Sequence, residues 1–246
     1  MSDDLNSYGV SQKLVHAIQP LYDQWRKDPG MELEVRLGLL SNKGFQATVT
    51  KDFYMSLQDR LSSNSGLKTT PEVLMCTQNY AQPCSIRQRS IKEPGKPART
   101  IYQEVVKIDS VDWMCDGSVC HGRVALKHET EVKEGPGNQP ITRVRLQQRQ
   151  VYHYPPNDPV VEYCFTQVRT GPTAVEARKP STPLCYEVEM ELLHHRFWTN
   201  MSSDDAVNQL IQFAIDLMVT REEDMLNHRK PVKATLCDVT RKRKRV

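Results

Sequence analysis

Two short stretches of the sequence carry a glutamate at every second position. Successive side chains of a β-strand point to opposite faces, so the glutamates of each stretch would share one face. Glutamate is depleted in strands and neighbouring like charges repel, which makes this pattern unusual. A solvent-exposed strand face explains one such stretch well, but two of them favour a functional cluster. The five residues are Glu32 and Glu34 in MELEVRLGLL, and Glu187, Glu189 and Glu191 in YEVEMELL.

The stretches between these two carry mainly the opposite charge at alternating positions. In TRVRLQQRQVY, Arg143, Arg145, Gln147 and Arg149 share one face. In GRVALKHETEV, the face that holds Arg123 and Lys127 also holds Glu129 and Glu131. The other basic side chains of this region are Arg87 and Arg89 in SIRQRSIK, and Lys107 in the strand that follows.

This order of charges predicts a metal-assisted polyanion site. If the sheet closes on itself, its first and last strands meet and the five carboxylates cluster. Such a cluster is costly unless a cation compensates it. Ligation by carboxylates alone is hard-oxygen chemistry, which indicates Mg²⁺ or Mn²⁺. A ring of arginine and lysine opposite the metal suits a polyphosphate.

The elements that must position these residues are mostly strands. Period-two patterns predict about eight strands with short connections, typical of one antiparallel sheet system that can close as a barrel. The fold class is therefore mainly β (α+β), with a helix outside the sheet at each end of the chain. The strands are expected near residues 31–40, 72–80, 84–91, 99–109, 119–133, 141–154, 160–169 and 185–193.

The two expected helices have different sequence signals. Near the N-terminus, Leu14, Ile18 and Trp25 recur at helical spacing, and Pro20 is expected to kink or split that helix. Near the C-terminus, Ser202 or Ser203 can cap a helix whose apolar stripe ends at Met218.

Composition and charge bound the class of protein. The chain has 246 residues, of which 38% are hydrophobic and 26% charged, as in an ordinary globular protein. No apolar run approaches the roughly 20 residues of a membrane helix, so no membrane association is expected. The formal net charge is +3, yet residues 241–245 are all basic, so the rest of the chain is slightly acidic. We expect one domain over residues 1–240 and a disordered basic tail over 241–246.

Three motifs in order give a resemblance to a known family. ELEVRLG, a basic strand of the form R-x-x-x-R at Arg145 and Arg149, and YEVEMEL resemble the RNA 5′-triphosphatases of the fungal and protozoan messenger-RNA capping type. These enzymes belong to the triphosphate tunnel metalloenzyme superfamily, and the match spans roughly residues 31–193. The resemblance implies an eight-stranded antiparallel barrel that forms a tunnel, with charged side chains inside and helices outside.

The resemblance also implies roles for the glutamates. Glu32, Glu34, Glu187 and Glu189 would hold Mg²⁺ or Mn²⁺, with Glu191 as a further ligand or a support through water. Glu129 matches the glutamate that orients or deprotonates the attacking water. Glu131 shares its face, so a shift of two residues would exchange them.

The basic residues match the family less completely. Arg145 and Arg149 match its RxKxR strand, but Gln147 stands where the family has lysine. Two other positions in EYCFTQVR also depart from the family, with Glu162 and Cys164 before Thr166 where a basic and then an acidic residue are usual. The other side of the triphosphate would meet Arg87 or Arg89, with Lys107, and Lys127 belongs to the same inward basic set.

The implied activity is removal of the γ-phosphate from the 5′-triphosphate of nascent RNA, or of a free nucleoside triphosphate. The product is a 5′-diphosphate end for a separate guanylyltransferase, in the first step of mRNA cap formation. The basic tail is expected to be a nuclear-import signal or, alternatively, an arm that holds RNA. Two other functions stay open: a thiamine triphosphatase or inorganic tripolyphosphatase of the same superfamily, and a non-catalytic nuclear RNA-binding adaptor.

Overall fold

The computed structural model describes residues 5, 9–81, 84–116, 118–218 and 233–237. The basic tail predicted at 241–246 lies outside these described residues. None of the described helices is long and apolar enough to cross a membrane.

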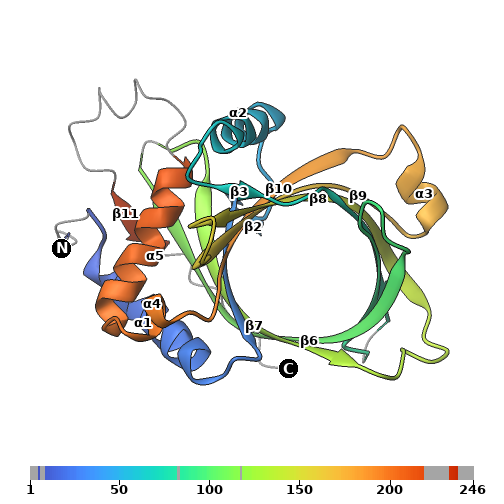
Figure 1. Cartoon of the computed structure of the whole chain (residues 1–246), viewed down its shortest axis with the longest axis horizontal. Coiled ribbons are helices and arrows are strands. Elements are labelled where there is room, and N and C mark those ends of the chain that lie inside the picture. Colours follow the sequence, from blue (N-terminus) through green and yellow to red (C-terminus); the bar gives the residue numbers. More distant parts are fainter. Residues whose placement is uncertain (1–4, 6–8, 82–83, 117, 219–232, 238–246) are drawn as a thin grey trace.

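Eight antiparallel strands close into a barrel, which Figure 1 shows nearly end-on. Their order around the barrel is β10-β9-β8-β4-β5-β6-β7-β1, and the pairing of β1 with β10 closes it. All eight strands expected from the sequence are present within a few residues, apart from a longer β6. Their bounds are β1 (Met31–Ser41), β4 (Val73–Tyr80), β5 (Ile86–Lys92), β6 (Arg99–Cys115), β7 (His121–Val132), β8 (Ile141–Tyr154), β9 (Val161–Gly171) and β10 (Leu184–Leu192).

Because side chains alternate along each strand, charged side chains lie on the inner face of the barrel wall and apolar side chains on its outer face. On β1, Leu33, Val35 and Leu37 are fully buried in the hydrophobic core outside the barrel. The glutamates between them therefore face the barrel interior. The same strand thus supplies the packing against the helices and the charged lining.

The two long helices lie side by side against one flank of the barrel, at the left in Figure 1. They are α1 (Gln12–Lys27) and α5 (Ser203–Met218). Tyr22 of α1 donates a 2.6 Å hydrogen bond from its hydroxyl to the carbonyl of Trp198, which fixes α1 against the segment before α5. Both helices were expected, but α1 is not split at Pro20, because packing of its apolar face outweighs the one backbone hydrogen bond that proline removes.

Several shorter elements were not expected from the sequence. Helix α2 (Lys51–Ser62) lies over β10, with Thr50 accepting a hydrogen bond from the backbone N–H of Phe53 at its N-terminus. Its buried residues include Phe53, Leu57 and Leu61, whose spacing of four is typical of a helix, although no helix was predicted there. The others are α3 (Ala174–Arg178), α4 (Arg196–Thr199), β2 (Gly44–Gln46), β3 (Lys68–Thr69) and β11 (Ala234–Leu236).

Strand β6 extends past its expected end near residue 109 because its last residues pair with strands on both sides. β11 pairs with residues Trp113 to Cys115 of β6, and Trp113 is fully buried. β7 pairs with the same extension from Asp109 to Trp113, so two neighbouring strands define it.

Candidate active site

The barrel encloses a cavity of about 840 Å³, lined by charged side chains from six of its eight strands. Every residue that the sequence predicted for the site lines this cavity. They are the carboxylates Glu32, Glu34, Glu129, Glu187, Glu189 and Glu191, and the cations Arg87, Arg89, Lys107, Lys127, Arg145 and Arg149. Their placement together follows from closure of the sheet, and their catalytic roles remain predictions.

The first and last barrel strands bring the two glutamate motifs into register. Glu34 of β1 lies opposite Glu191 of β10, and Arg36 lies opposite Glu189. Opposite residues of an antiparallel pair have Cβ atoms only about 5 Å apart. The two motifs, more than 150 positions apart in the sequence, thus form one acidic wall of the cavity.

Cations compensate much of this acidic wall. Arg36 contacts Glu34 at 2.6 Å and Glu189 at 3.3 Å. Lys127 of the neighbouring strand β7 contacts Glu32 at 2.8 Å and Glu34 at 3.2 Å. Burial alone would lower the pKa of Lys127, but these carboxylates outweigh it and raise that pKa. Lys127 is therefore held charged within the acidic wall.

Glu189 and Glu187 pair with the basic strand β8, which is separated from β10 by β9 alone. Arg149 contacts Glu189 at 3.1 Å, and Arg145 contacts Glu187 at 2.6 Å. Burial opposes ionisation of Glu189, but Arg36 and Arg149 outweigh it and lower its pKa to about 2. For Glu187 burial is the larger effect, and its pKa is raised.

Glu191 differs from the other glutamates in this wall, since it forms no ion pair with any described residue. Burial and the neighbouring carboxylate of Glu32 raise its pKa to about 8. A buried carboxyl beside others of its kind lacks a compensating positive charge. This is the observation that fits a divalent cation to the donor set, which consists of carboxylate oxygens, the ligands that Mg²⁺ and Mn²⁺ prefer.

The carboxylates are nevertheless turned toward protein cations. Among the described residues, no three His, Cys, Asp or Glu side chains converge as a ready metal-binding group. The five carboxylates expected to cluster therefore form an acidic wall in which Arg36 and Lys127 lie between the glutamates. Arg36 shares its strand face with Glu32 and Glu34 but was not among the residues predicted for the site.

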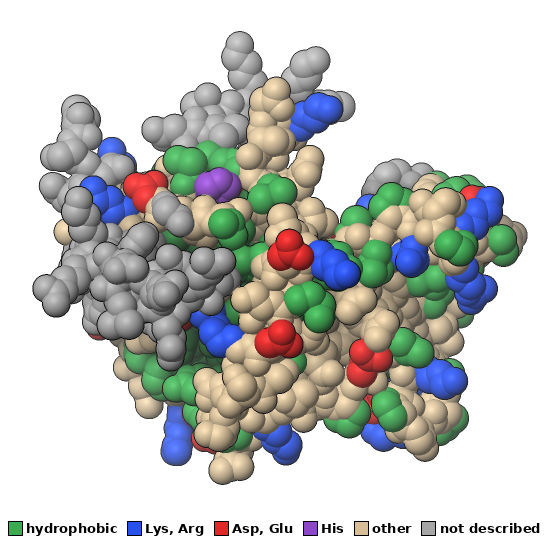
Figure 2. Space-filling view, turned by 90° about the horizontal axis from the view of Figure 1, so that it is seen from above, with side chains coloured by type: hydrophobic (Ala, Val, Ile, Leu, Met, Phe, Trp, Pro, Cys, Tyr) green, Lys and Arg blue, Asp and Glu red, His purple; other side chains and the backbone are tan. Residues whose placement is uncertain are grey.

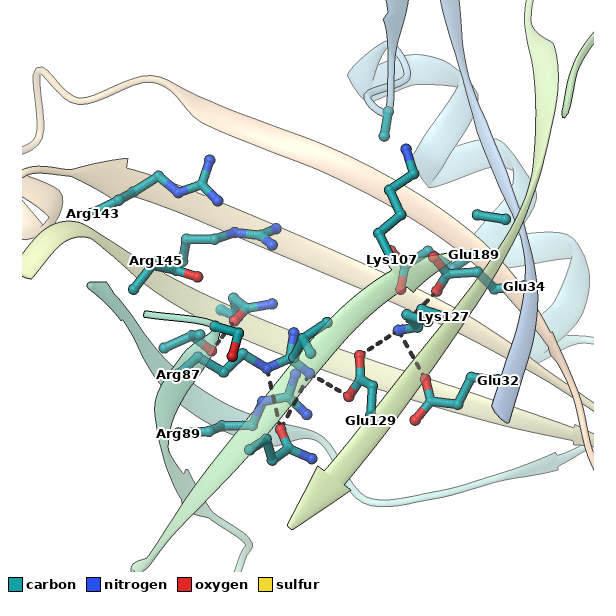
Figure 3. Close-up of a pocket in the computed structure, with 18 of the residues that line it drawn as sticks. Glu32, Glu34, Arg87, Arg89, Lys107, Lys127, Glu129, Arg143, Arg145 and Glu189 are labelled. Carbon is teal, nitrogen blue, oxygen red and sulfur yellow. Dashed lines mark hydrogen bonds and ion pairs between the residues drawn. The ribbon is translucent and has the colours of Figure 1, made fainter. Parts of the chain in front are cut away.

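The opposite side of the cavity carries an excess of positive charge, as Figure 3 shows for Arg87, Arg89, Arg143 and Arg145. Burial and the adjacent Arg87 lower the pKa of Arg89 to about 10. The Nε of Arg89 is buried and has no hydrogen-bond partner among the described residues. An arginine that is buried, unpaired and repelled by its neighbours is a strong candidate to bind an anion.

Glu129 lies between the two sides of the cavity. Its side chain is only 4% exposed and contacts Lys127 at 2.7 Å and the guanidinium of Arg87. Burial would raise its pKa, but these cations outweigh burial and lower it. Glu131 is exposed and does not line the cavity, so the register places Glu129 in the position predicted for the water-directing residue.

The positions that depart from the family pattern have other partners. Gln147, where a lysine was expected, is buried and accepts a 2.8 Å hydrogen bond from the Thr77 hydroxyl. Glu162 does not line the cavity and contacts His153 at 2.9 Å. Thr166, treated only as a strand marker, accepts a 3.1 Å hydrogen bond from Arg149 Nε and so helps to orient that arginine.

Comparison with known proteins places this barrel among solved structures. No protein-family model matches the chain, and no curated protein matches it by sequence. The RNA triphosphatase Pct1 of S. pombe superposes with a TM-score of 0.62 at 13% identity, over 86% of this chain and 93% of that one. The chain has the tunnel-barrel fold of the RNA triphosphatases.

Two other solved structures share the tunnel barrel. The RNA triphosphatase domain of a trifunctional Mimivirus mRNA capping enzyme matches with a TM-score of 0.57 at 11% identity, over 88% of this chain and all of that one. A second structure of S. pombe Pct1, in complex with the Spt5 CTD, matches with a TM-score of 0.60 at 12% identity, over 85% of this chain and 93% of that one. The tunnel barrel expected from the sequence motifs is thereby confirmed as the fold.

Proposed function

We propose that the protein removes the γ-phosphate from the 5′-triphosphate end of RNA in a reaction that depends on a divalent metal. The observation that carries the proposal is the charge division inside the tunnel. A wall of glutamates from β1 and β10 faces arginines from β5 and β8, one of which, Arg89, has a buried Nε without a partner. A metal-bound polyphosphate satisfies both walls at once.

The metal would be Mg²⁺ or Mn²⁺. Four carboxylates would hold it, with Glu191 as a further ligand or a support through water, and the uncompensated charge at Glu191 supports this assignment. When bound, such an ion neutralises charge on the phosphates and polarises the γ-phosphoryl group. The four are Glu32, Glu34, Glu187 and Glu189.

The cations of this chain would bind and neutralise the triphosphate. Arg145 and Arg149 already hold carboxylates, so phosphate oxygens could replace those carboxylates as acceptors. Arg89 offers an unused buried donor. Lys107, also in the cavity lining, would add a point charge. Positioned positive charge of this kind supplies most of the catalysis in phosphoryl transfer.

Glu129 would direct the attacking water. Its lowered pKa keeps the carboxylate ionised, so that it accepts a hydrogen bond from the water. The water oxygen then forms a bond to the γ-phosphorus while the bond to the β,γ-bridging oxygen breaks. Inorganic phosphate leaves, and the RNA keeps a 5′-diphosphate end ready for guanylyl transfer by a separate enzyme. That enzyme, the capping guanylyltransferase, is the proposed functional partner, and the nucleus is the proposed compartment.

The test is release of phosphate by the purified full chain from RNA labelled at its γ-phosphate. We expect release with Mg²⁺ or Mn²⁺ and none with EDTA. Free tripolyphosphate, thiamine triphosphate and a nucleoside triphosphate are assayed in parallel. If tripolyphosphate or thiamine triphosphate is hydrolysed with a kcat/KM well above that for RNA, the protein is a small-molecule polyphosphatase, and the proposal is wrong about the substrate.

The adaptor alternative has little support in the structure. It requires exposed aromatic rings among basic residues, on which RNA bases stack. The two candidates near Arg149 both pack against other rings: Tyr152 is 1% exposed and lies edge-on to Phe165, and Tyr154, 37% exposed, lies edge-on to Phe213. Tyr152 therefore belongs to the core.

A further inference from the structure

A second cavity lies outside the tunnel, on the outer surface of the barrel. We call it the outer groove. It has a volume of about 410 Å³ and is formed by β4, β5, β8 and β9, with the end of α3 and the start of β10 along its edge. Its lining residues are Leu74, Met75, Cys76, Ser90, Ile91, Lys92, Ala98, Leu146, Gln147, Gln148, Gln167, Arg169, Arg178 and Leu184.

The floor of the outer groove is aliphatic. Leu74 is 48% exposed there, and Leu146 and Leu184 line the same groove. On β4, Leu74 and Cys76 lie on the outer face, whereas Thr77 lines the tunnel on the other side of the wall. The groove is therefore the outer face of the strands that carry the basic side of the tunnel.

The rim of the outer groove is basic. Lys92, Arg169 and Arg178 line it, and no lining residue is acidic. Glu72 lies at one edge, where it accepts a 2.6 Å hydrogen bond from Gln148. Lys92 and Arg178 are exposed and form no ion pair with any described residue. In Figure 2, hydrophobic and basic side chains lie next to one another at the right-hand end of the molecule, where α3 lies.

The edge of the groove is a built structure. Arg169 donates hydrogen bonds to the carbonyls of Lys179, Pro180 and Thr182, which ties the segment after α3 to β9. The Thr182 hydroxyl closes the same turn with a 2.6 Å hydrogen bond to the carbonyl of Glu176. These contacts fix the α3 segment, so the groove does not depend on a loose loop.

We propose that the outer groove binds an acidic peptide segment of a partner protein, with a leucine or aromatic side chain of the peptide on the floor. Aliphatic floor and basic rim together require a ligand that is apolar at its centre and negatively charged around it. An RNA strand fits less well, because the lining offers no aromatic ring for base stacking and only three cations. The proposal does not depend on the reaction inside the tunnel.

The test is an unbiased selection of random twelve-residue peptides displayed on phage, against the full chain and against Leu74→Asp. We expect the wild-type chain to enrich peptides with aspartate or glutamate around a leucine, phenylalanine or tryptophan, and the variant to lose them. The most enriched peptide is then synthesised with a fluorescent label. Its Kd, measured by polarisation, should rise at least tenfold for Leu74→Asp and for Arg178→Glu.

Val106→Asp is the matched control. Val106 is also 48% exposed, but it lies on β6 away from the groove, so its substitution should leave the Kd unchanged. Thermal unfolding of each variant checks that the fold is retained. The proposal is overturned if no peptide is enriched, if the enriched peptides are basic, if Leu74→Asp selects the same peptides, or if a 5′-hydroxyl RNA binds in the Leu74-dependent manner instead. Phosphate release by Arg178→Glu should equal that of the wild-type chain, which separates this site from the tunnel.

Discussion

Glu34 and Glu191 lie opposite each other where β1 and β10 close the barrel, and only one of them is compensated. Glu34 contacts both Arg36 and Lys127. Glu191 has no ion-pair partner among the described residues, and burial and Glu32 raise its pKa to about 8. The closure that completes the tunnel therefore also concentrates negative charge that a bound cation would relieve.

This relationship predicts how the metal affects stability. Glu191→Gln removes a repelled charge, so the metal-free protein at pH 9 should gain roughly 2–4 °C in Tm, the shift that about 1 kcal/mol gives in a domain of this size. Added Mn²⁺ should raise the Tm of the wild-type chain more than that of the variant. Thermal unfolding in EDTA and in Mn²⁺ measures both effects. A variant that is less stable in EDTA would show that the repulsion is absent.

The other four glutamates should be required for turnover. Replacing Glu32, Glu34, Glu187 or Glu189 singly with alanine should lower kcat for phosphate release by at least about 10²-fold, the scale of losing one preorganised electrostatic partner. Circular dichroism should show the fold retained, because the hydrophobic core that holds the barrel lies outside it and does not include these side chains. Near-normal metal-dependent rates in all four variants would contradict the tunnel mechanism.

Glu129 and Glu131 provide a matched pair for the water-directing role. Glu129→Gln removes the ionised acceptor between Lys127 and Arg87 and should lower kcat by about 10²–10⁴-fold, the usual contribution of a positioned base. Glu131→Gln, exposed and outside the cavity, should keep the wild-type rate. An equal loss of kcat in both variants would mean that the carboxylates support the fold rather than the reaction. Unfolding curves would then show that both variants are destabilised.

Arg149 tests contact with the triphosphate. Its guanidinium donates hydrogen bonds to Thr166 and Glu189, which fixes its orientation in the tunnel. Arg149→Ala should abolish most of the activity, and Arg149→Lys should recover only part of it, because an ammonium cannot form the forked contact. Arg143, which is exposed, should matter less when replaced with alanine. Rates in the reverse order would shift the phosphate toward the Arg143 end of the tunnel.

Strand positions and their inward faces could be predicted from the sequence because alternation is a local property. Glu32 and Glu34 share a face whatever surrounds them, and so do Arg145 and Arg149. Their meeting in one cavity required only that the sheet closes. The sequence near these residues could not distinguish Glu129 from Glu131, because both share a strand face. They differ only in that Glu129 lies inside the barrel, whereas Glu131 lies near its end and is exposed.

Contacts between strands could not be predicted from the sequence for a different reason. Contact between Lys127 and Glu34 depends on the register of β7 against β1, and contact between Arg145 and Glu187 depends on the registers of β8 and β10 against β9, which lies between them. The Thr77–Gln147 hydrogen bond likewise joins strands 70 positions apart. The sequence showed that Gln147 departs from the family pattern, but it could not identify the buried partner of Gln147, which lies on another strand.

The basic tail yields the last prediction, which concerns where the protein acts. Residues 241–245 are five consecutive cations, a pattern typical of nuclear-import signals and of arms that hold RNA. We expect import, so a chain ending at Thr240 should hydrolyse triphosphate-ended RNA with unchanged kinetics at every salt concentration. Fused to two tandem fluorescent proteins, which block passive entry, it should leave the nucleus and spread through the cytoplasm. If the tail were an RNA arm, truncation would instead raise KM for long RNA. The dependence of KM on salt concentration would become shallower, by the release of up to about five counterions, and short triphosphates would be unaffected. A truncated fusion that still concentrates in the nucleus would contradict the import signal, because no other run of five basic residues occurs in the sequence.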